Sequence, residues 1–139
     1  MYTLEQVLQK TFNIIKDEKP HTFFLYGDLG VGKTHFVKNI ARLLKVNDNI
    51  TSPTFVILRD YTIPNDTRKL VHADFYRFKG NISLHLLDEV ALFDYLFYDI
   101  VFIEWADLIE RFLPDSVLKN VIRIKINKDL YGTRTYEFL

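Results

Sequence analysis

One stretch of the sequence, residues 27–34, constrains the fold more than any other. It reads Gly-Asp-Leu-Gly-Val-Gly-Lys-Thr, which fits the pattern G-x-x-x-x-G-K-[ST] at every fixed position. Glycines let the backbone curl tightly, so that its N–H groups can converge on phosphate oxygens. An aromatic run, 22–26, precedes the loop, and a segment with helical apolar spacing, 36–44, follows it. The sequence therefore predicts a strand, a phosphate-binding loop and a helix in succession.

The side chains of this loop predict how a nucleotide would be held. The ammonium of Lys33 and the positive end of the following helix dipole would face the phosphates. The hydroxyl of Thr34 would bind Mg²⁺. We therefore expect a nucleotide and Mg²⁺ as ligands, with Lys33 among the catalytic residues.

Two carboxylates are candidates for the acid that such a site also needs. Glu104 follows the apolar run Ile100–Ile103, and Asp74 follows the strand-like run Leu70–Ala73. In proteins with this loop, a carboxylate at the end of a neighbouring strand holds Mg²⁺ or orients the attacking water. The uninterrupted apolar run before Glu104 favours it for this role, and Asp74 is the second candidate.

Hydrophobic periodicity predicts the other elements of the fold. Helices are expected over residues 4–15, 83–97 and 106–112, the first opened by a capping box of Thr3 and Gln6. Further strands are expected at residues 54–61, 69–76, 100–104, 121–126 and 133–139. This order predicts an α/β fold with a mainly parallel central sheet flanked by helices and an antiparallel C-terminal hairpin. We expect a single domain over residues 1–139.

Composition excludes several classes of function. Eighteen basic and eighteen acidic residues give a net charge of zero, whereas a general nucleic-acid binder needs a basic excess. Without any cysteine, the chain can form no disulfide, thiolate zinc site or iron–sulfur cluster. No apolar run approaches the ~20 residues that cross a bilayer, and the N-terminus lacks the pattern of a signal peptide. We expect a cytoplasmic protein with no membrane role.

Other nucleotide-dependent functions remain open on the residues alone. Residues 127–129 and 129–132 imitate the GTPase signatures N-K-x-D and D-x-x-G, but their spacing is wrong and we interpret them as a hairpin turn. A small-molecule P-loop kinase usually needs an arginine-rich lid, whereas the arginines here are scattered. A nucleotide-gated binding module with little turnover is the third possibility.

Four motifs together resemble one family. They are the loop 27–34, Thr-Ser-Pro-Thr-Phe at 51–55, His-Ala-Asp-Phe-Tyr-Arg at 72–77 and Ile-Glu-Trp-Ala at 103–106. Their order and spacing resemble the TsaE (YjeE) family of bacterial P-loop ATPases, which support synthesis of threonylcarbamoyladenosine in tRNA. The resemblance covers nearly the whole chain, including a Gly-x-Arg turn at 132–134. It implies ATP as the nucleotide, partners of the TsaB and TsaD type, and contact with tRNA only indirectly through that complex.

The resemblance also implies roles for individual residues. Thr34 and Glu104 would be Mg²⁺ ligands, Glu104 and Asp74 would be catalytic with Lys33, and Thr51, Ser52 and Thr54 would form a switch-like segment. The expected nucleotide-binding residues are Asp28, Leu29, Gly30, Val31, Gly32, Lys33, Thr34, His35, Trp105 and Arg134.

The sequence departs from the family pattern at three positions. His35 replaces a hydroxyl residue expected near the α-phosphate, Val31 replaces alanine, and Ala91 replaces glycine in a helix turn. None of the three alters the lysine, threonine or acid roles. His72, although it lies within a motif, is expected to be an ordinary strand-end imidazole that hydrogen-bonds to the backbone.

Overall fold

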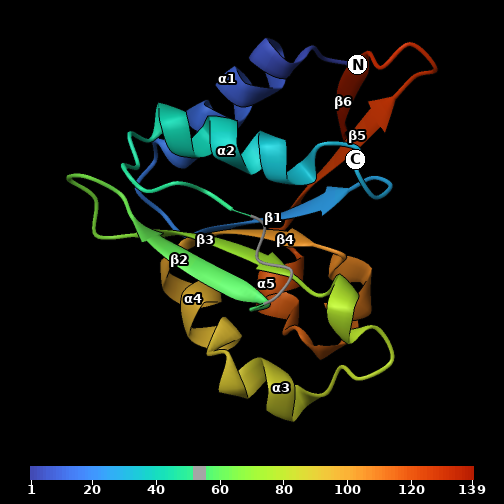
Figure 1. Cartoon of the computed structure of the whole chain (residues 1–139). Helices are drawn as coiled ribbons and strands as arrows, with labels where there is room; N and C mark the ends of the chain where they lie inside the picture. The colour runs from blue at the N-terminus through green and yellow to red at the C-terminus, as the bar shows by residue number, and fades with distance from the viewer. Residues whose placement is uncertain (52–55) are drawn as a thin grey trace.

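The structure, a computed structural model, describes residues 1–51 and 56–139 (Figure 1). The expected switch-like residues Ser52 and Thr54 lie outside the described residues. The strands are β1 (His21–Tyr26), β2 (Leu58–Thr62), β3 (Lys69–Asp74), β4 (Ile100–Glu104), β5 (Ile122–Lys128) and β6 (Arg134–Phe138). The α-helices are α1 (Leu4–Ile15), α2 (Lys33–Leu43), α3 (Leu84–Glu89), α4 (Leu92–Tyr98) and α5 (Asp115–Leu118).

The strands form one six-stranded sheet in the order β2-β3-β4-β1-β5-β6. β3, β4, β1 and β5 run parallel, and β6 pairs antiparallel with β5. β2 adds a second antiparallel pair at the opposite edge, against β3. The predicted fold class, a mainly parallel α/β sheet with an antiparallel C-terminal hairpin, is thus confirmed.

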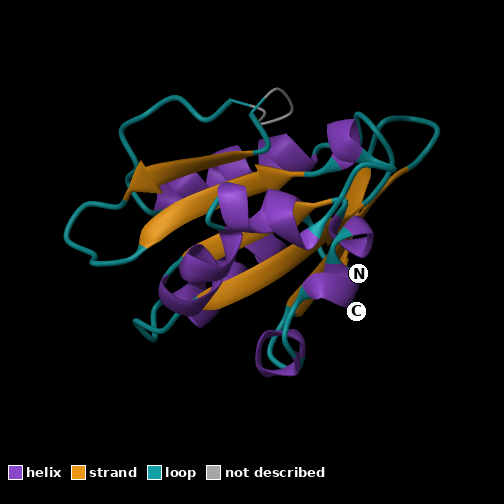
Figure 2. Ribbon diagram, turned by 90° about the horizontal axis from the view of Figure 1, so that it is seen from below, coloured by secondary structure: helices purple, strands orange, loops and turns teal. Residues whose placement is uncertain are grey.

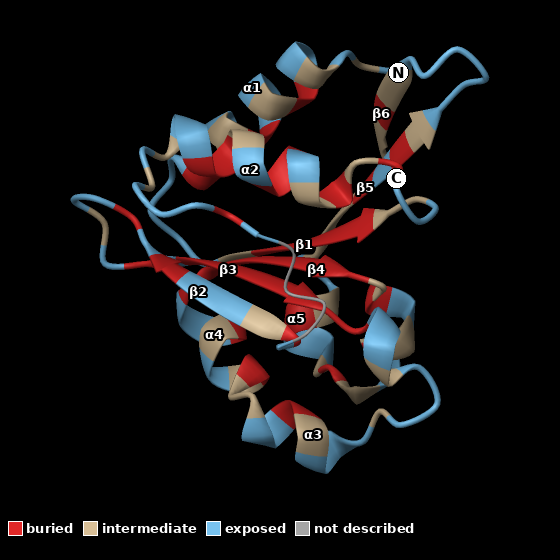
Figure 3. Cartoon of the chain, viewed as in Figure 1, coloured by how far each residue is buried: buried red, intermediate tan, exposed pale blue. Residues whose placement is uncertain are grey.

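Helices cover both faces of the sheet (Figures 1 and 2). α1 and α2 pack on one face, where Phe36 and Ile40 join a core with Phe23 and Phe102, whose rings stack 4.6 Å apart. α3, α4 and α5 cover the other face, around Val101 and the rest of a second apolar cluster. Because both faces are covered, every residue of β4 is buried (Figure 3). No helix in the described part of the chain is long and apolar enough to cross a membrane.

Several element boundaries differ from the prediction. The single helix expected over 83–97 is two helices, because Ala91 adopts a left-handed conformation with φ of 58° and turns the chain between α3 and α4. The strand expected over 69–76 ends at Asp74, whose side chain accepts a hydrogen bond from the backbone N–H of Tyr76 at 3.0 Å. This turn leads the chain out of the sheet.

The remaining differences are short helical segments, one late strand start and a longer β5, which continues through residues 127 and 128 where a turn was expected. The helix expected over 106–112 is a pair of 3₁₀ turns, Ala106–Leu108 and Glu110–Phe112. The four-residue α5 was not predicted, since its length is too short to show helical periodicity. In the described residues the strand expected over 54–61 begins only at Leu58, and residues 54–55 lie outside them.

The predicted start of the first helix is confirmed. The hydroxyl of Thr3 accepts from the backbone N–H of Gln6 at 3.2 Å, and the side-chain oxygen of Gln6 accepts from the N–H of Thr3 at 2.9 Å. This capping box satisfies two donors that a helix start leaves free. The helix therefore begins directly after Tyr2, whose backbone pairs with Tyr136 of β6.

Candidate functional site

The glycine-rich loop connects the end of β1 to the start of α2, as predicted. Gly27 and Gly32 have φ of 148° and 115°, backbone conformations that residues with a Cβ rarely adopt. A Cβ at Gly27 would lie 2.6 Å from Val31 Cγ1 and 2.9 Å from the carbonyl oxygen of Ile126. At Gly32 it would lie 2.9 Å from Arg134 Nε. Gly27 therefore needs glycine for space as well as for backbone conformation, and Gly32 needs it for backbone conformation.

Lys33, the first residue of α2, turns its side chain back onto the loop. Its Nζ donates to the carbonyl oxygen of Gly27 at 2.5 Å and lies 4.7 Å from the ring centroid of Trp105. Only 6% of the residue is exposed. Burial lowers the pKa of the Lys33 ammonium, and the negative charges of Glu104 and Asp74 partly oppose this shift.

The two candidate carboxylates lie side by side beneath the loop. Asp74 and Glu104 end the parallel strands β3 and β4 and are paired in register, so their side chains point to the same face of the sheet. Both are buried, with 6% and 4% of the residue exposed. Thr34 Oγ1 donates to Glu104 Oε2 at 3.2 Å, which joins the loop to the sheet. The expected group of loop lysine, loop threonine and two acids is therefore assembled at one edge of the sheet.

His72 is the residue that the sequence interpretation missed. It is fully buried, and its Nε2 lies 2.5 Å from Glu104 Oε2, so its ring bonds to the candidate acid and not to the backbone. The expectation of an ordinary strand-end imidazole is therefore wrong. Its place two residues before Asp74, on the same face of β3, was the signal in the sequence.

Trp105 lies beside the site, as predicted. Its backbone is left-handed, with φ of 59° and ψ of 40°, and its indole packs against Tyr76 at 4.8 Å between ring centroids. The indole Nε1 is buried and has no hydrogen-bond partner among the described residues. Non-glycine residues in this conformation are uncommon and occur often at ligand sites.

Arg134 and His35 make hydrogen bonds within the protein. Arg134 Nε donates to the carbonyl oxygen of Val31 at 2.7 Å, so this side chain supports the loop from β6. His35 is exposed on α2, where Asn39 Nδ2 lies 3.2 Å from its Nε2. Thr51 is also exposed, and it lines a separate hollow beside the later part of α2.

Most of the predicted residues line one small pocket of about 230 Å³. Its lining is Leu29, Gly30, Gly32, Lys33, Thr34, His35, Asp74, Glu104 and Trp105. A neighbouring hollow on the other side of the loop is lined by Gly27, Asp28, Leu29, Gly30, Val31, Lys125, Ile126, Asn127, Lys128 and Asp129. Asp28 and Val31 thus line this hollow and not the pocket that holds the acids.

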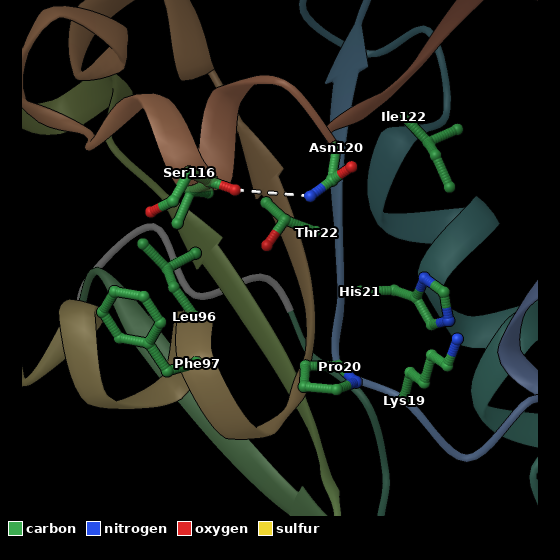
Figure 4. Close-up of a pocket in the computed structure, with 10 residues that line it drawn as sticks. Lys19, Pro20, His21, Thr22, Leu96, Phe97, Ser116, Asn120 and Ile122 are labelled. Carbon is green, nitrogen blue, oxygen red and sulfur yellow. Dashed lines mark hydrogen bonds between the residues drawn. The ribbon is translucent and has the colours of Figure 1, made fainter.

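A larger hollow, of about 570 Å³, lies at the other end of β1 (Figure 4). His21, Phe97 and Ser116 are among its lining residues, and Asn120 Nδ2 donates to the carbonyl oxygen of Ser116 at 3.4 Å. None of the predicted site residues lines it. The smaller pocket is therefore the candidate site, because it holds the buried acids and the lysine.

The oxygen atoms of this pocket fit Mg²⁺. This ion usually takes one or two carboxylates together with substrate phosphates and water, and it seldom occupies a cage made of protein alone. The carboxylate of Glu104 is an oxygen donor of this kind, the hydroxyl of Thr34 hydrogen-bonded to it offers a second oxygen, and Asp74 lines the same pocket. In the described part of the chain, no three His, Asp or Glu side chains gather around a possible metal position. This ligand set suits a phosphate-bound Mg²⁺.

The strand, the glycine-rich loop, the lysine and threonine at the start of α2 and the acids on adjacent strands define a P-loop α/β fold. A model of one family, described as threonylcarbamoyl adenosine biosynthesis protein TsaE, matches residues 2–136. The chain belongs to the TsaE family, whose members take part in biosynthesis of the tRNA modification threonylcarbamoyladenosine.

Two relatives and one solved structure support this placement. The tRNA threonylcarbamoyladenosine biosynthesis protein TsaE of Rickettsia bellii is 34% identical over 113 residues, which cover 80% of this chain and 74% of the relative. The protein of the same name from Rickettsia typhi is 34% identical over 124 residues, which cover 87% and 83%. The crystal structure of YdiB from Bacillus subtilis matches with a TM-score of 0.63 and 29% identity, over 94% of this chain and 78% of that one.

Proposed function

We propose that this protein binds ATP with Mg²⁺ and hydrolyses it in support of the threonylcarbamoyl transferase complex that modifies tRNA. One observation carries the proposal: a single pocket holds the loop lysine Lys33, the hydroxyl of Thr34 and the buried acids Asp74 and Glu104. The family's part in threonylcarbamoyladenosine biosynthesis supplies the process. Proteins of the TsaB and TsaD type are the proposed partners, and tRNA is reached through them.

The loop residues would hold the triphosphate. Backbone N–H groups of residues 28–34 and the dipole of the eleven-residue α2 favour phosphate at this position. Lys33 would leave the carbonyl oxygen of Gly27 to contact the β- and γ-phosphates. Thr34 and Glu104 would hold Mg²⁺, which neutralises phosphate charge when bound.

The two acids would serve the chemical step. Glu104, held at the end of a fully buried strand, would orient the attacking water in line with the γ-phosphate. Asp74, its register partner, would be the second catalytic carboxylate. Trp105, whose indole ring covers the Lys33 ammonium, would lie beside the nucleotide.

The C-terminal hairpin gives no support for recognition of guanine. Asn127 and Lys128 belong to β5, and Asp129 Oδ1 accepts from the backbone N–H groups of Tyr131 and Thr133, both at 2.9 Å. Asp129 thus closes a turn. Because residues 127–129 belong to a strand and a turn, they form no loop that could recognise guanine as an N-K-x-D motif does.

Phosphate release from ATP tests the proposal, measured for the protein alone and with TsaB- and TsaD-type partners. Release that increases with the partners supports an ATPase of the complex. Transfer of the phosphate to an added small acceptor would instead indicate a kinase. Binding of ATP with no release under either condition would indicate a nucleotide-gated binding module.

A further inference from the structure

His72 and Glu104 form a buried pair inside the sheet. His72 lies on β3 opposite Phe102, two residue pairs before the pair of Asp74 and Glu104, so its side chain points to the same face as the acids. None of the His72 surface is exposed, and only 4% of Glu104 is. The 2.5 Å separation of His72 Nε2 and Glu104 Oε2 makes this pair part of the acid's immediate surroundings.

The acceptor determines which nitrogen of the ring carries the proton. A carboxylate oxygen faces Nε2, so Nε2 is the donor. Nδ1 is buried and has no hydrogen-bond partner among the described residues. An acceptor without a partner is better tolerated than a buried N–H without one, which fits the tautomer with its single proton on Nε2.

Glu104 Oε2 has two hydrogen-bonding neighbours, and only one of them would keep this contact when Mg²⁺ binds. One is the hydroxyl of Thr34 at 3.2 Å, on the loop. In the proposed function this hydroxyl also serves Mg²⁺, so it cannot alone determine where the carboxylate points. The other is His72, which is fully buried and belongs to β3, a strand held between β2 and β4. His72 is therefore the constant constraint on the carboxylate.

We infer that His72 is a positioning residue that holds the Glu104 carboxylate in its working orientation through the Nε2–H donor. This inference rests on the proposed ATPase function of the same pocket. The donor occupies one lone pair of Oε2 and fixes the plane of the carboxylate, which leaves Oε1 for metal or water. Groups that orient a reacting or metal-binding residue in this way affect activity or metal affinity about 10- to 100-fold.

The test compares two substitutions of similar length. In His72→Gln the amide N–H reaches about as far as Nε2, whereas His72→Met fills a similar space without a donor. We expect His72→Met to lower kcat for ATP hydrolysis by about 10- to 100-fold with ATP affinity retained, and His72→Gln to recover most of this loss. In a Glu104→Gln background, His72→Met should cause little further loss, because its effect passes through the same carboxylate.

Matched controls separate positioning from folding. His85→Met removes another histidine that pairs with a glutamate, Glu89 at 2.8 Å, on the surface of α3. It should leave turnover unchanged. Thermal unfolding of each variant reports whether the fold is retained. Equal rates for His72→Met and wild type, or equal losses for the Met and Gln variants, would overturn the inference.

A measurement without turnover distinguishes failure of this inference from failure of the proposed function. The ¹H–¹⁵N NMR signals of the His72 ring should show a protonated, hydrogen-bonded Nε2 that shifts in Glu104→Gln. If wild type hydrolyses no ATP, the proposed function fails and this spectrum still tests the pairing. An unprotonated Nε2, or a signal indifferent to Glu104→Gln, would overturn the inference even if ATP is hydrolysed.

Discussion

The ammonium of Lys33 donates to the carbonyl oxygen of Gly27, at 2.5 Å, so the last part of the loop closes onto its first residue. The indole of Trp105 covers the same ammonium at 4.7 Å, an arrangement that favours a cation. The Lys33 ammonium is therefore held against its own loop by these two contacts, close to where a phosphate would bind. Nucleotide binding would exchange the Gly27 carbonyl for phosphate oxygens.

Replacement of Lys33 by alanine should abolish productive ATP binding. The variant removes the main side-chain charge that would face the γ-phosphate. Isothermal titration with ATP and Mg²⁺ measures the effect, with Lys38→Ala as the matched control, since Lys38 is an exposed lysine further along α2. Tight, Mg²⁺-dependent binding by Lys33→Ala would contradict the assignment of the loop.

Trp105 should report ATP binding by its fluorescence. It is the only tryptophan in the chain, and its ring lies next to Lys33 and Tyr76. Movement of the ammonium toward phosphate changes the charge at the indole face, so the emission of wild type should change on addition of ATP and Mg²⁺. Lys33→Ala should show no such change at the same concentrations. An unchanged wild-type spectrum, despite binding measured by titration, would contradict the proposed movement of Lys33.

Glu104→Gln should separate binding from hydrolysis. The amide keeps the shape and one oxygen ligand but removes the charge, while the loop backbone still carries most phosphate contacts. We expect ATP binding to persist and hydrolysis, measured with partners, to fall at least about a hundredfold, the low end for loss of a general base. Asp74→Asn should also slow turnover. Wild-type rates in Glu104→Gln would make Glu104 structural and transfer the role to Asp74.

GTP should not be preferred over ATP. Asp129 is committed to the hairpin turn through its bonds to Tyr131 and Thr133, so it is not placed to recognise guanine. Competition titration of bound ATP with GTP measures the preference. A clear advantage for GTP would overturn the ATPase proposal and favour a GTPase.

Much of this site could be predicted because its signals are local. The loop 27–34 is contiguous in sequence, and Asp74 and Glu104 each follow an apolar strand. Parallel strands bring their carboxyl ends to one edge, so the meeting of these acids with the loop follows from the topology. The order of strands and helices could likewise be predicted from the hydrophobic pattern of the sequence.

The features that were not predicted depend on residues distant in sequence or on an unusual local backbone conformation. His72 and Glu104 are 32 residues apart, and their bond requires β3 beside β4 in this register. Ala91 lies within an apolar spacing that continues through it, so the pattern could not show its left-handed turn. The long side chain of Arg134 reaches the loop from β6, and no spacing rule predicts such a contact.

Away from the site, the hydroxyl of Tyr95 on α4 donates to Asp60 Oδ2 on β2 at 2.7 Å. Lys69 on β3 lies 3.2 Å from the same carboxylate oxygen. The bond to Asp60, followed by burial, raises the pKa of Tyr95 from 10.0 to about 12. The folded state thus favours the protonated phenol, so this contribution to stability is complete below about pH 10 and is lost as the pH rises toward 12.

Tyr95→Phe should therefore lower the free energy of unfolding by about 1 kcal/mol near pH 7, a modest value because the Asp60 carboxylate is partly exposed. Urea denaturation measures this difference, with Tyr98→Phe as the control, because Tyr98 is on the same helix and 71% exposed. Between pH 10 and 12 the stability of wild type should fall toward that of Tyr95→Phe. A difference that stays constant across this range would show that the phenol and Asp60 do not share the proton-dependent bond.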